Sequence, residues 1–223
     1  RAKSNFFLLE TMRWDPNEGI RLKDLHLDRI TASAKHFGFD FDREKTSNSL
    51  DQIQGNESKR VRLLSSPNGS TEIQILDLPD PTTEFWEVPI DVVPVQSENE
   101  FLFHKTTMRE IYDVARSRFP DSPDVLLWNE RGELTETTTG NLVMEMEGKL
   151  LTPPVICGLL PGTFRRQLIA EGVITENVIH RSDLNKASSL WMINSLRGWV
   201  PLRFNQKITP VNLEQTPERV YEI

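Results

Sequence analysis

The sequence predicts an α+β protein made of two parts. In the first 76 residues, strand-like and helix-like apolar patterns follow one another. Residues 79–94 then carry several prolines, which favour a connector or an edge segment over a continuous element. The rest of the chain holds many short strand patterns between a few helical ones. We therefore expect a smaller N-terminal α/β domain over residues 1–97 and a C-terminal β-rich domain over residues 98–223.

Length and composition indicate a soluble globular protein. The chain has 223 residues, of which 37% are hydrophobic and 26% charged, enough for a sizeable core. A net charge of −7 and the lack of a basic block argue against a nucleic-acid partner. We find no apolar run of membrane-spanning length and no signal-peptide pattern. The lone Cys157 fits a reducing compartment, and the scattered histidines predict no metal site. The expected location is the cytoplasm.

The first part is predicted to hold one strand, two helices and a hairpin. Leu27, Ile30 and Ala34 follow helical spacing, and a glycine after such a run is a common helix end. The expected elements are a strand at 6–13, a helix capped by Asp24 and ended by Gly38, a short surface helix within 42–56, a hairpin of 60–64 and 71–76 that turns at 67–69, and an extended edge segment at 88–95.

The second part is predicted to consist mainly of strands joined by tight turns. The clearest signal is Glu147-Gly148 between two apolar runs, which is typical of a hairpin. The expected elements are a helix at 106–118, a buried strand at 125–128, a turn at 129–132 and a strand through 137, a hairpin of 141–146 and 149–152, a helix at 163–171 ended by Gly172, a short helix capped by Asp183, a strand at 190–194, a loop at 195–198 and a last strand.

Lys105 is the first candidate for chemistry. It follows the apolar run Phe101–Phe103, and apolar surroundings disfavour an ammonium group and lower its pKa. A lysine in such a place can form a Schiff base with a carbonyl substrate or with pyridoxal phosphate. Taken alone, Lys105 is better explained as a residue that ends a strand and extends to water, and it is the motifs downstream that favour the Schiff-base role.

Three other places could bind or balance charge. The glycine-flanked loop from Gly158 to Arg165 opens into a helix, where free N–H groups favour a small phosphate. Asn194 and Ser195 offer a second anion site at a strand end. Glu136 lies among threonines, either on a polar strand edge or as an ionised carboxylate that receives a protonated ring nitrogen.

These candidates belong to a longer series of motifs in a fixed order. The series is Leu9-Glu10-Thr11, His26-Leu27-Asp28-Arg29, His104-Lys105 with Arg109, Asn129-Glu130-Arg131-Gly132 with Thr135, Glu136 and Asn141, Thr152-Pro153-Pro154, Gly158–Gly162 with Arg165, and Asn194–Gly198. With it, the sequence resembles the class IV pyridoxal-phosphate enzymes. That family includes branched-chain aminotransferases, D-amino-acid aminotransferases and 4-amino-4-deoxychorismate lyases.

The resemblance implies the two-part fold of class IV pyridoxal-phosphate enzymes, similar to D-amino-acid aminotransferase. It also implies a shortened N-terminal domain, because only Arg1–Asn5 precede the first strand. The Asn194–Gly198 loop and the Lys-x-x-x-Arg spacing are most similar to the lyase branch. Branched-chain aminotransferases usually carry a tyrosine five residues after the lysine, where this chain has Glu110. Met108 stands where the family often has asparagine.

Residue roles follow from the resemblance. Lys105 would be the cofactor lysine and proton carrier, and Glu136 would pair with the pyridine nitrogen; both would be catalytic. The expected cofactor-binding residues are Arg29, Lys105, Glu136, Asn141, Gly162, Thr163, Phe164 and Ser195. The expected substrate-binding residues are Leu9, Ser195, Leu196 and Arg197. Arg109 would either support the lysine or lie on the helix surface. A homodimer is implied by the family.

Three functional hypotheses follow. The first is a pyridoxal-phosphate lyase that forms 4-aminobenzoate and pyruvate from 4-amino-4-deoxychorismate, in folate biosynthesis. The second is a class IV aminotransferase, a transferase acting on small amino acids or amines. The third is a non-catalytic relative that binds a phosphorylated ligand. The third hypothesis requires no particular set of cofactor residues, whereas Lys105, Glu136 and Arg29 are all present.

Overall fold

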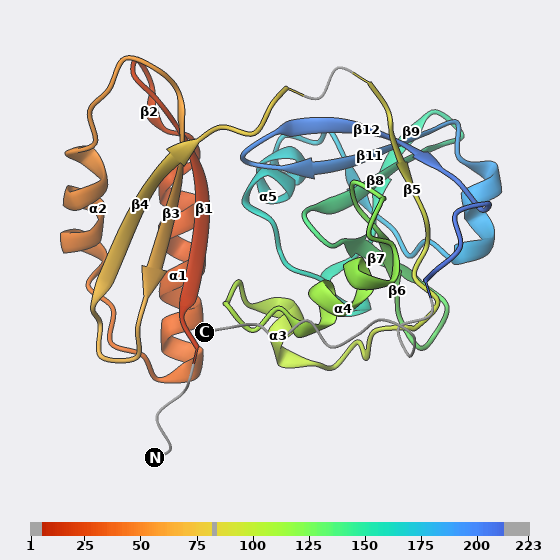
Figure 1. Cartoon of the computed structure of the whole chain (residues 1–223), viewed down its shortest axis with the longest axis horizontal. Helices are drawn as coiled ribbons and strands as arrows, with labels where there is room; N and C mark the ends of the chain where they lie inside the picture. The colour runs from red at the N-terminus through yellow and green to blue at the C-terminus, as the bar shows by residue number, and fades with distance from the viewer. Residues whose placement is uncertain (1–5, 82–83, 212–223) are drawn as a thin grey trace.

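The computed structural model describes residues 6–81 and 84–211, and the chain forms two units side by side (Figure 1). The first unit is a four-stranded sheet in the order β2-β1-β3-β4 with two helices. Its elements are β1 (Leu8–Asp15), β2 (Gly19–Ile20), α1 (Lys23–Phe37), α2 (Arg43–Asp51), β3 (Lys59–Ser65) and β4 (Thr71–Asp77). β1 and β3 pair antiparallel, with Thr11 opposite Arg62 and Arg13 opposite Arg60.

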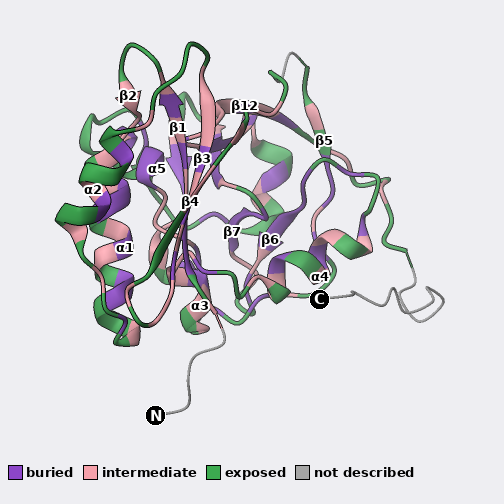
Figure 2. Cartoon of the chain, turned by 60° about the vertical axis from the view of Figure 1, so that its left-hand side comes forward, coloured by how far each residue is buried: buried purple, intermediate pink, exposed green. Residues whose placement is uncertain are grey.

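Alternation along β1 and β3 gives this first sheet two different faces. Leu8 and Met12 of β1 and Leu63 of β3 are buried in one cluster with Leu27 and Ile30 of α1. Successive strand residues point to opposite faces, so Thr11, Arg60 and Arg62 face away from the helices. Figure 2 shows the buried residues along the strands and on the sides of α1 and α2 that turn toward them. The apolar face therefore holds the helices, and the other face is free to line a site.

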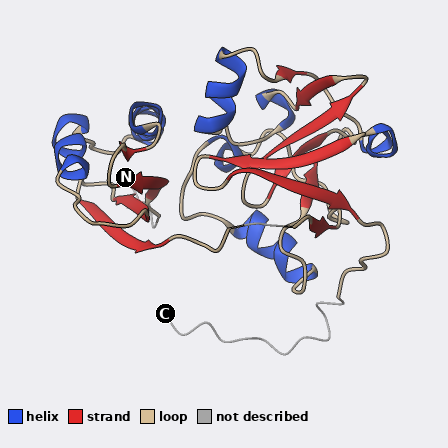
Figure 3. Cartoon of the chain, turned by 90° about the horizontal axis from the view of Figure 1, so that it is seen from above, coloured by secondary structure: helices blue, strands red, loops and turns tan. Residues whose placement is uncertain are grey.

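The second unit contains a larger sheet with short helices around it (Figure 3). The strand path is β10-β9-β8-β11-β12-β5, and β7 pairs with both β6 and β8. Its elements are β5 (Trp86–Val88), α3 (Glu100–Phe103), α4 (Glu110–Arg118), β6 (Leu126–Trp128), β7 (Leu134–Thr137), β8 (Asn141–Met146), β9 (Lys149–Thr152), η1 (Val155–Cys157), α5 (Thr163–Ala170), β10 (Thr175–Glu176), η2 (Arg181–Lys186), β11 (Ser189–Asn194) and β12 (Gly198–Phe204).

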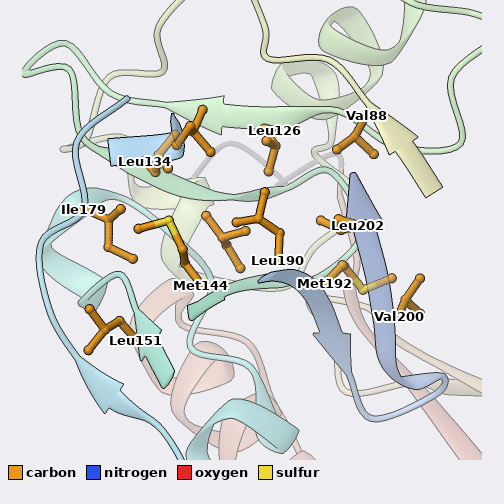
Figure 4. Packing of buried hydrophobic residues seen from close by; sticks show 12 residues of the cluster. Val88, Leu126, Leu134, Met144, Leu151, Ile179, Leu190, Met192, Val200 and Leu202 are labelled. Carbon is orange, nitrogen blue, oxygen red and sulfur yellow. The ribbon is translucent and has the colours of Figure 1, made fainter. Parts of the chain in front are cut away.

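The core of the second unit lies inside the curve of this sheet. Leu126, Leu134, Met144, Met192 and Leu202 come from five strands and point into one apolar cluster (Figure 4). Burying large side chains stabilises a domain by about 1.5–3 kcal/mol each, before the entropy cost of ordering them. The strands of the second unit therefore supply its core.

Two local predictions are confirmed closely. The hairpin of β8 and β9 turns at Glu147 and Gly148, which both have positive φ values of 52° and 73°. That is the backbone of a two-residue hairpin turn of the kind that favours glycine. Gly38 ends α1 with φ 69°, in the left-handed conformation.

Several helix boundaries differ from the expectation. Leu22, with no side-chain cap, precedes α1, so Asp24 lies in the first turn and is not the cap. The surface helix α2 ends at Asp51, before Gly55. Asp183 also lies inside the 3-10 helix η2, where its carboxylate accepts a hydrogen bond from the N–H of His180. In both cases the acidic residue acts from the first turn of its helix.

The segment around Lys105 also differs from the expectation. The apolar run before it forms the single helical turn α3, and the next helix begins at Glu110 and not at Thr106. The reason is tertiary: the N–H of Leu9 donates to the C=O of Lys105 at 2.9 Å, and Thr107 N–H donates to Phe7 C=O at 3.0 Å. Because the segment pairs with the start of β1, its backbone is extended and not helical.

Strand β5 bears on the domain division. It pairs in parallel with β12, with Trp86 opposite Leu202 and Val88 opposite Phe204. A strand is part of the sheet to which it is hydrogen-bonded. The domain boundary expected after residue 97 stays a prediction. Because β5 pairs with β12 of the second unit, we propose that the boundary lies between β4 and β5 instead. Within the described residues, no helix is long and apolar enough to span a membrane.

Candidate active site

A cavity of about 540 Å³ lies where the two units meet. Leu9, Thr11 and Arg29 line it from the first unit, and Lys105 and Glu136 line it from the second. The free face of the first sheet therefore forms one wall, and the strand ends of the second sheet form the other. Every expected site residue lines this cavity except Phe164, although these residues are spread over most of the chain.

Lys105 enters the cavity from the extended segment that pairs with β1. Desolvation, together with the positive charges of Arg29 and Arg109, lowers the pKa of its amine to about 8. The amine is therefore more often neutral near pH 8 than an exposed lysine would be. A neutral amine can attack a carbonyl carbon, so Lys105 has the electrostatic setting of a Schiff-base lysine.

Glu136 comes from β7 and is 3% exposed. Burial raises the pKa of its carboxyl to about 8, against the effect of the hydrogen bond from Tyr112. Tyr112 Oη donates to Oε1 at 2.8 Å, Leu160 N–H to the same oxygen at 3.2 Å, and Asn141 Nδ2 to Oε2 at 3.3 Å. A buried carboxyl of this kind needs a positive partner to ionise fully at neutral pH.

The start of α5 forms the anion site at another side of the cavity. Gly162 is the N-cap and α5 has no side-chain cap, so the amides of Thr163 and Phe164 have no hydrogen-bond acceptor among the described residues. A Cβ on Gly162 would lie 2.1 Å from Oδ1 of Asn141, so only glycine fits there. Free amides and the helix dipole suit a phosphate.

Phe164 differs from the other expected site residues. Its ring is 5% exposed and packs with Val143 and Ile193 in the core between α5 and β11. The Arg21 guanidinium lies over that ring, 4.6 Å from its centroid. Only the backbone amide of Phe164 is therefore available to a ligand.

Arg29 reaches the same anion site from α1. Its Nε and Nη2 donate to the two carboxylate oxygens of Glu10 at 2.8 and 2.5 Å, and its Nη1 donates to the C=O of Pro161 at 3.3 Å. His26 contacts Glu10 as well, with Nδ1 2.6 Å from Oε2. Glu10 is fully buried; desolvation would raise its pKa, but Arg29 and His26 hold that pKa at about 2. The ionised Glu10 thus fixes Arg29 beside the loop that leads into α5.

The loop between β11 and β12 is internally hydrogen-bonded. Asn194 Oδ1 accepts from the backbone N–H groups of Leu196 and Arg197 at 3.1 and 2.8 Å. Those two amides are therefore engaged in the turn, and Leu196 faces the cavity by its side chain. Ser195 is 7% exposed and also lines the cavity. Arg197 Nη1 donates to the C=O of Asp80 at 2.9 Å, which ties the loop to the segment after β4.

Sequence reasoning missed four residues of this site. Glu10 appeared only inside a motif, and Tyr112 only as an apolar helix residue. Arg60 and Arg62 on β3 were read as parts of a strand, yet both line the cavity. A signal for Glu10 exists, because an acidic residue between the apolar Leu8 and Met12 on the same strand face needs a buried partner.

The comparison with known families decides the identity. The profile of the family "Amino-transferase class IV" matches residues 8–203. The chain belongs to this family. A class IV enzyme of this kind uses pyridoxal phosphate, and the chain is a pyridoxal-phosphate-dependent enzyme. The hypothesis of a non-catalytic relative is therefore not retained.

Relatives of the class IV chain carry both lyase and aminotransferase names. It is 31% identical over 205 residues to a Schizosaccharomyces pombe protein named "Putative aminodeoxychorismate lyase", and the match covers 87% of each chain. A "Putative amino-acid aminotransferase" structure from Mesorhizobium loti has a TM-score of 0.83 and 35% identity, covering 90% of this chain and 100% of that one.

More distant structures support the fold. The 4-amino-4-deoxychorismate lyase structure from Pseudomonas aeruginosa has a TM-score of 0.75 and 18% identity, covering 92% of this chain and 86% of that one. The expected class IV two-part fold is confirmed.

The residues of this class IV site fit the cofactor. Pyridoxal phosphate has an aldehyde, a ring nitrogen and a phosphate, and the cavity offers a desolvated lysine, a buried carboxyl and a helix start with unengaged amides. Three complementary groups around one cavity match the three polar ends of the molecule. We propose that Lys105, Glu136 and the Gly162–Thr163 helix start hold those ends, with Arg29 beside the phosphate.

Proposed function

We propose that this class IV enzyme is a lyase that converts 4-amino-4-deoxychorismate into 4-aminobenzoate and pyruvate. The observation that carries the proposal is a cationic wall of the cavity, made of Arg60 and Arg62. The proposed substrate carries two carboxylates, one on the ring and one on the enolpyruvyl ether. A branched-chain amino acid carries one carboxylate and an apolar side chain, so it offers no second carboxylate to pair with the second arginine.

Arg60 and Arg62 lie on the face of β3 that turns toward the second unit. Within the described part of the chain neither forms an ion pair with a carboxylate, whereas Arg43, Arg118 and Arg131 do. Arg62 Nη1 donates only to Gln74 Oε1, at 3.2 Å, and Arg60 Nε is buried without a partner there. Guanidinium groups prefer planar carboxylate partners. These two are therefore suited to a substrate that brings more than one carboxylate.

The protein residues then divide the work. When bound, pyridoxal phosphate supplies an electron sink for the carbon that bears the amino group. Lys105 removes a proton from the substrate and later returns as the amine that releases the product. Glu136 holds the proton on the cofactor ring nitrogen. The arginines orient the substrate so that the C–O bond between the ring and the ether oxygen breaks and its electron pair leaves with enolpyruvate. Enolpyruvate takes up the proton that Lys105 removed and becomes pyruvate, and the ring that remains is aromatic.

An aminotransferase is the second candidate, and the Mesorhizobium loti structure favours it, with 35% identity to a protein of aminotransferase name. It would act on a small amino acid or amine. The two activities share Lys105 and Glu136, so the cofactor residues support both. They differ in turnover: a lyase needs one substrate, and an aminotransferase needs a keto acid to recover its cofactor.

The test is turnover on 4-amino-4-deoxychorismate alone. We expect many equivalents of 4-aminobenzoate and pyruvate per enzyme, with no change in the cofactor form after the reaction. Arg60→Gln and Arg62→Gln should each raise KM more than they lower kcat, because they remove uniform carboxylate binding. A cofactor that converts to its amine form with amino acids, and recovers only with a keto acid, would establish the aminotransferase instead. A place in folate biosynthesis, a homodimer and a cytoplasmic location are proposed with the lyase.

A further inference from the structure

Tyr112 carries a group that its surroundings do not explain. Its ring is 7% exposed and packs with Leu102, Ala115 and Leu127 in the apolar cluster around α4. A phenylalanine would fill that space equally well. The hydroxyl, by contrast, reaches out of the cluster to Glu136 Oε1 at 2.8 Å. The packing therefore accounts for the ring, and only the contact with Glu136 accounts for the oxygen.

The phenol is the hydrogen-bond donor in this contact. Burial raises the pKa of Tyr112 well above its ordinary value, and the negative charge of Glu136 raises it further. The O–H therefore stays protonated through neutral pH, and the carboxylate is the better acceptor. A donor of this kind favours the ionised form of a carboxyl group over the neutral form.

Arg109 holds the Tyr112 ring in place. Its guanidinium lies over the ring, 4.7 Å from the centroid, and its Nη2 donates to the C=O of Thr138 at 2.8 Å. Arg109, at the start of α4, is thus held by the β7–β8 turn while its guanidinium covers the ring. Of the two roles that the sequence allows for Arg109, this geometry favours a supporting role, exerted on the Tyr112 ring.

We propose that Tyr112 is a positioning residue, which orients the Glu136 carboxyl group and favours its ionised form, so that Glu136 can hold a proton on the ring nitrogen of the bound cofactor. This inference rests on the proposed role of Glu136 in the class IV site. The other groups that face Glu136 are the charges of Lys105 and Arg109, the amide of Asn141 and the N–H of Leu160. Of these neutral donors, Tyr112 makes the shortest contact.

The first experiment measures Glu136 in protein without cofactor. Glutamate labelled with ¹³C at the side-chain carboxyl gives a resonance that Glu136→Gln identifies by its loss. In Tyr112→Phe we expect the pKa of that carboxyl to rise by about one pH unit, a tenfold change in proton affinity, because one donor to the anion is lost. Thr152→Val is the matched control, since it removes another buried hydroxyl, one that donates to Leu142 C=O at 2.7 Å. It should leave the Glu136 titration unchanged.

The second experiment strengthens the hydrogen bond that Tyr112 donates to Glu136. The chain has only two tyrosines, so biosynthetic replacement by 3-fluorotyrosine changes few sites. Its phenol is more acidic and donates more strongly, so the pKa of Glu136 should fall. Shifts in opposite directions for Tyr112→Phe and for fluorotyrosine support the proposal. An unchanged titration with fluorotyrosine overturns it, even if Tyr112→Phe were not to fold.

The cofactor-bound enzyme completes the test. With pyridoxal phosphate labelled by ¹⁵N in the ring, we expect the Tyr112→Phe resonance to move toward the value of an unprotonated nitrogen. If Tyr112→Phe changed the pKa of Glu136 but left the ring-nitrogen resonance unchanged, the proposed role of Tyr112 toward the cofactor would be rejected. Failure of the protein to bind pyridoxal phosphate at all would reject the proposed function, while the titration without cofactor would still decide the contact between Tyr112 and Glu136.

Discussion

Glu10 and Arg29 form a bidentate ion pair inside the first unit, with N–O distances of 2.8 and 2.5 Å. Glu10 lies on the helix-facing side of β1, and Arg29 extends from α1 past it to the loop before α5. The pair therefore joins the fold of the first unit to the proposed phosphate site. One carboxylate both satisfies a buried cation and determines where that cation points.

Glu10→Gln should lower the stability of the protein strongly. The change leaves Arg29 without its counter-charge in a site where the Glu10 side chain is 1% exposed. Removing one partner of a buried pair costs about 3–5 kcal/mol. Urea unfolding at pH 7 measures the loss. Inorganic phosphate or pyridoxal phosphate should restore part of it, because either anion can replace the missing charge. Equal unfolding midpoints for both proteins would contradict the assignment.

The same pair predicts a pH dependence. The pKa of Glu10 is about 2 in the folded protein, below its ordinary value of 4.5. A depressed pKa gives stability that is present above pH 4.5 and is lost as the pH falls toward 2. The difference in unfolding free energy between native protein and Glu10→Gln should therefore shrink over that interval. Glu133, whose pKa is also about 2, is present in both proteins and cancels from the difference.

Lys105 should be the attachment site of the cofactor. Protein loaded with pyridoxal phosphate and reduced with borohydride should carry the label on the peptide that contains Lys105, since its amine is desolvated and its pKa lowered to about 8. Mass spectrometry of the digest locates the label. Lys105→Ala should bind no cofactor covalently. A label on Lys149 or Lys186 would show that another amine is the reactive one.

Substitutions of Arg29 and of Glu136 should impair different properties of the enzyme, namely cofactor affinity and turnover. Arg29→Ala removes a charge-assisted contact of about 1.5–3 kcal/mol, so cofactor affinity should fall tenfold or more. Glu136→Gln should keep most of the affinity and lower kcat, because it changes the electronics of the ring and not the phosphate contacts. The double variant Arg29→Ala with Glu10→Gln controls for the unpaired Glu10. Indistinguishable cofactor affinity and turnover for the two single variants would contradict this separation.

Gly162→Ala tests the phosphate site by geometry alone. The added Cβ would lie 2.1 Å from Asn141 Oδ1, so the helix start or Asn141 must move. Since Asn141 also donates to Glu136, we expect weaker cofactor binding and altered turnover together. Gly55→Ala is the control, because its Cβ would only touch the Trp14 ring at 3.3 Å in the first unit. Cofactor titration by fluorescence compares the two variants.

Local patterns predicted the elements whose causes lie within a few residues. The β8–β9 turn follows from Glu147-Gly148, and the end of α1 follows from Gly38, because both positions need a left-handed backbone. The loop from Gly158 to Gly162 also predicted the start of α5, where Gly162 is the N-cap in an extended conformation. The motif order also predicted which residues line the cavity, since the resemblance carried them as one set.

The rest depended on contacts between distant parts of the chain. The segment before α4 is extended because β1 pairs with it across about a hundred residues, and no neighbouring residue could indicate that. In the sequence, Tyr112 has the pattern of an ordinary core residue. Only the fold shows that β7 places Glu136 beside its hydroxyl.

The sequence by itself determined the family, the two-part fold and most of the expected residues that line the cavity. Only the tertiary structure decided which buried group each one meets, because pairing energies depend on distance and burial, which arise only when distant parts of the chain pack together.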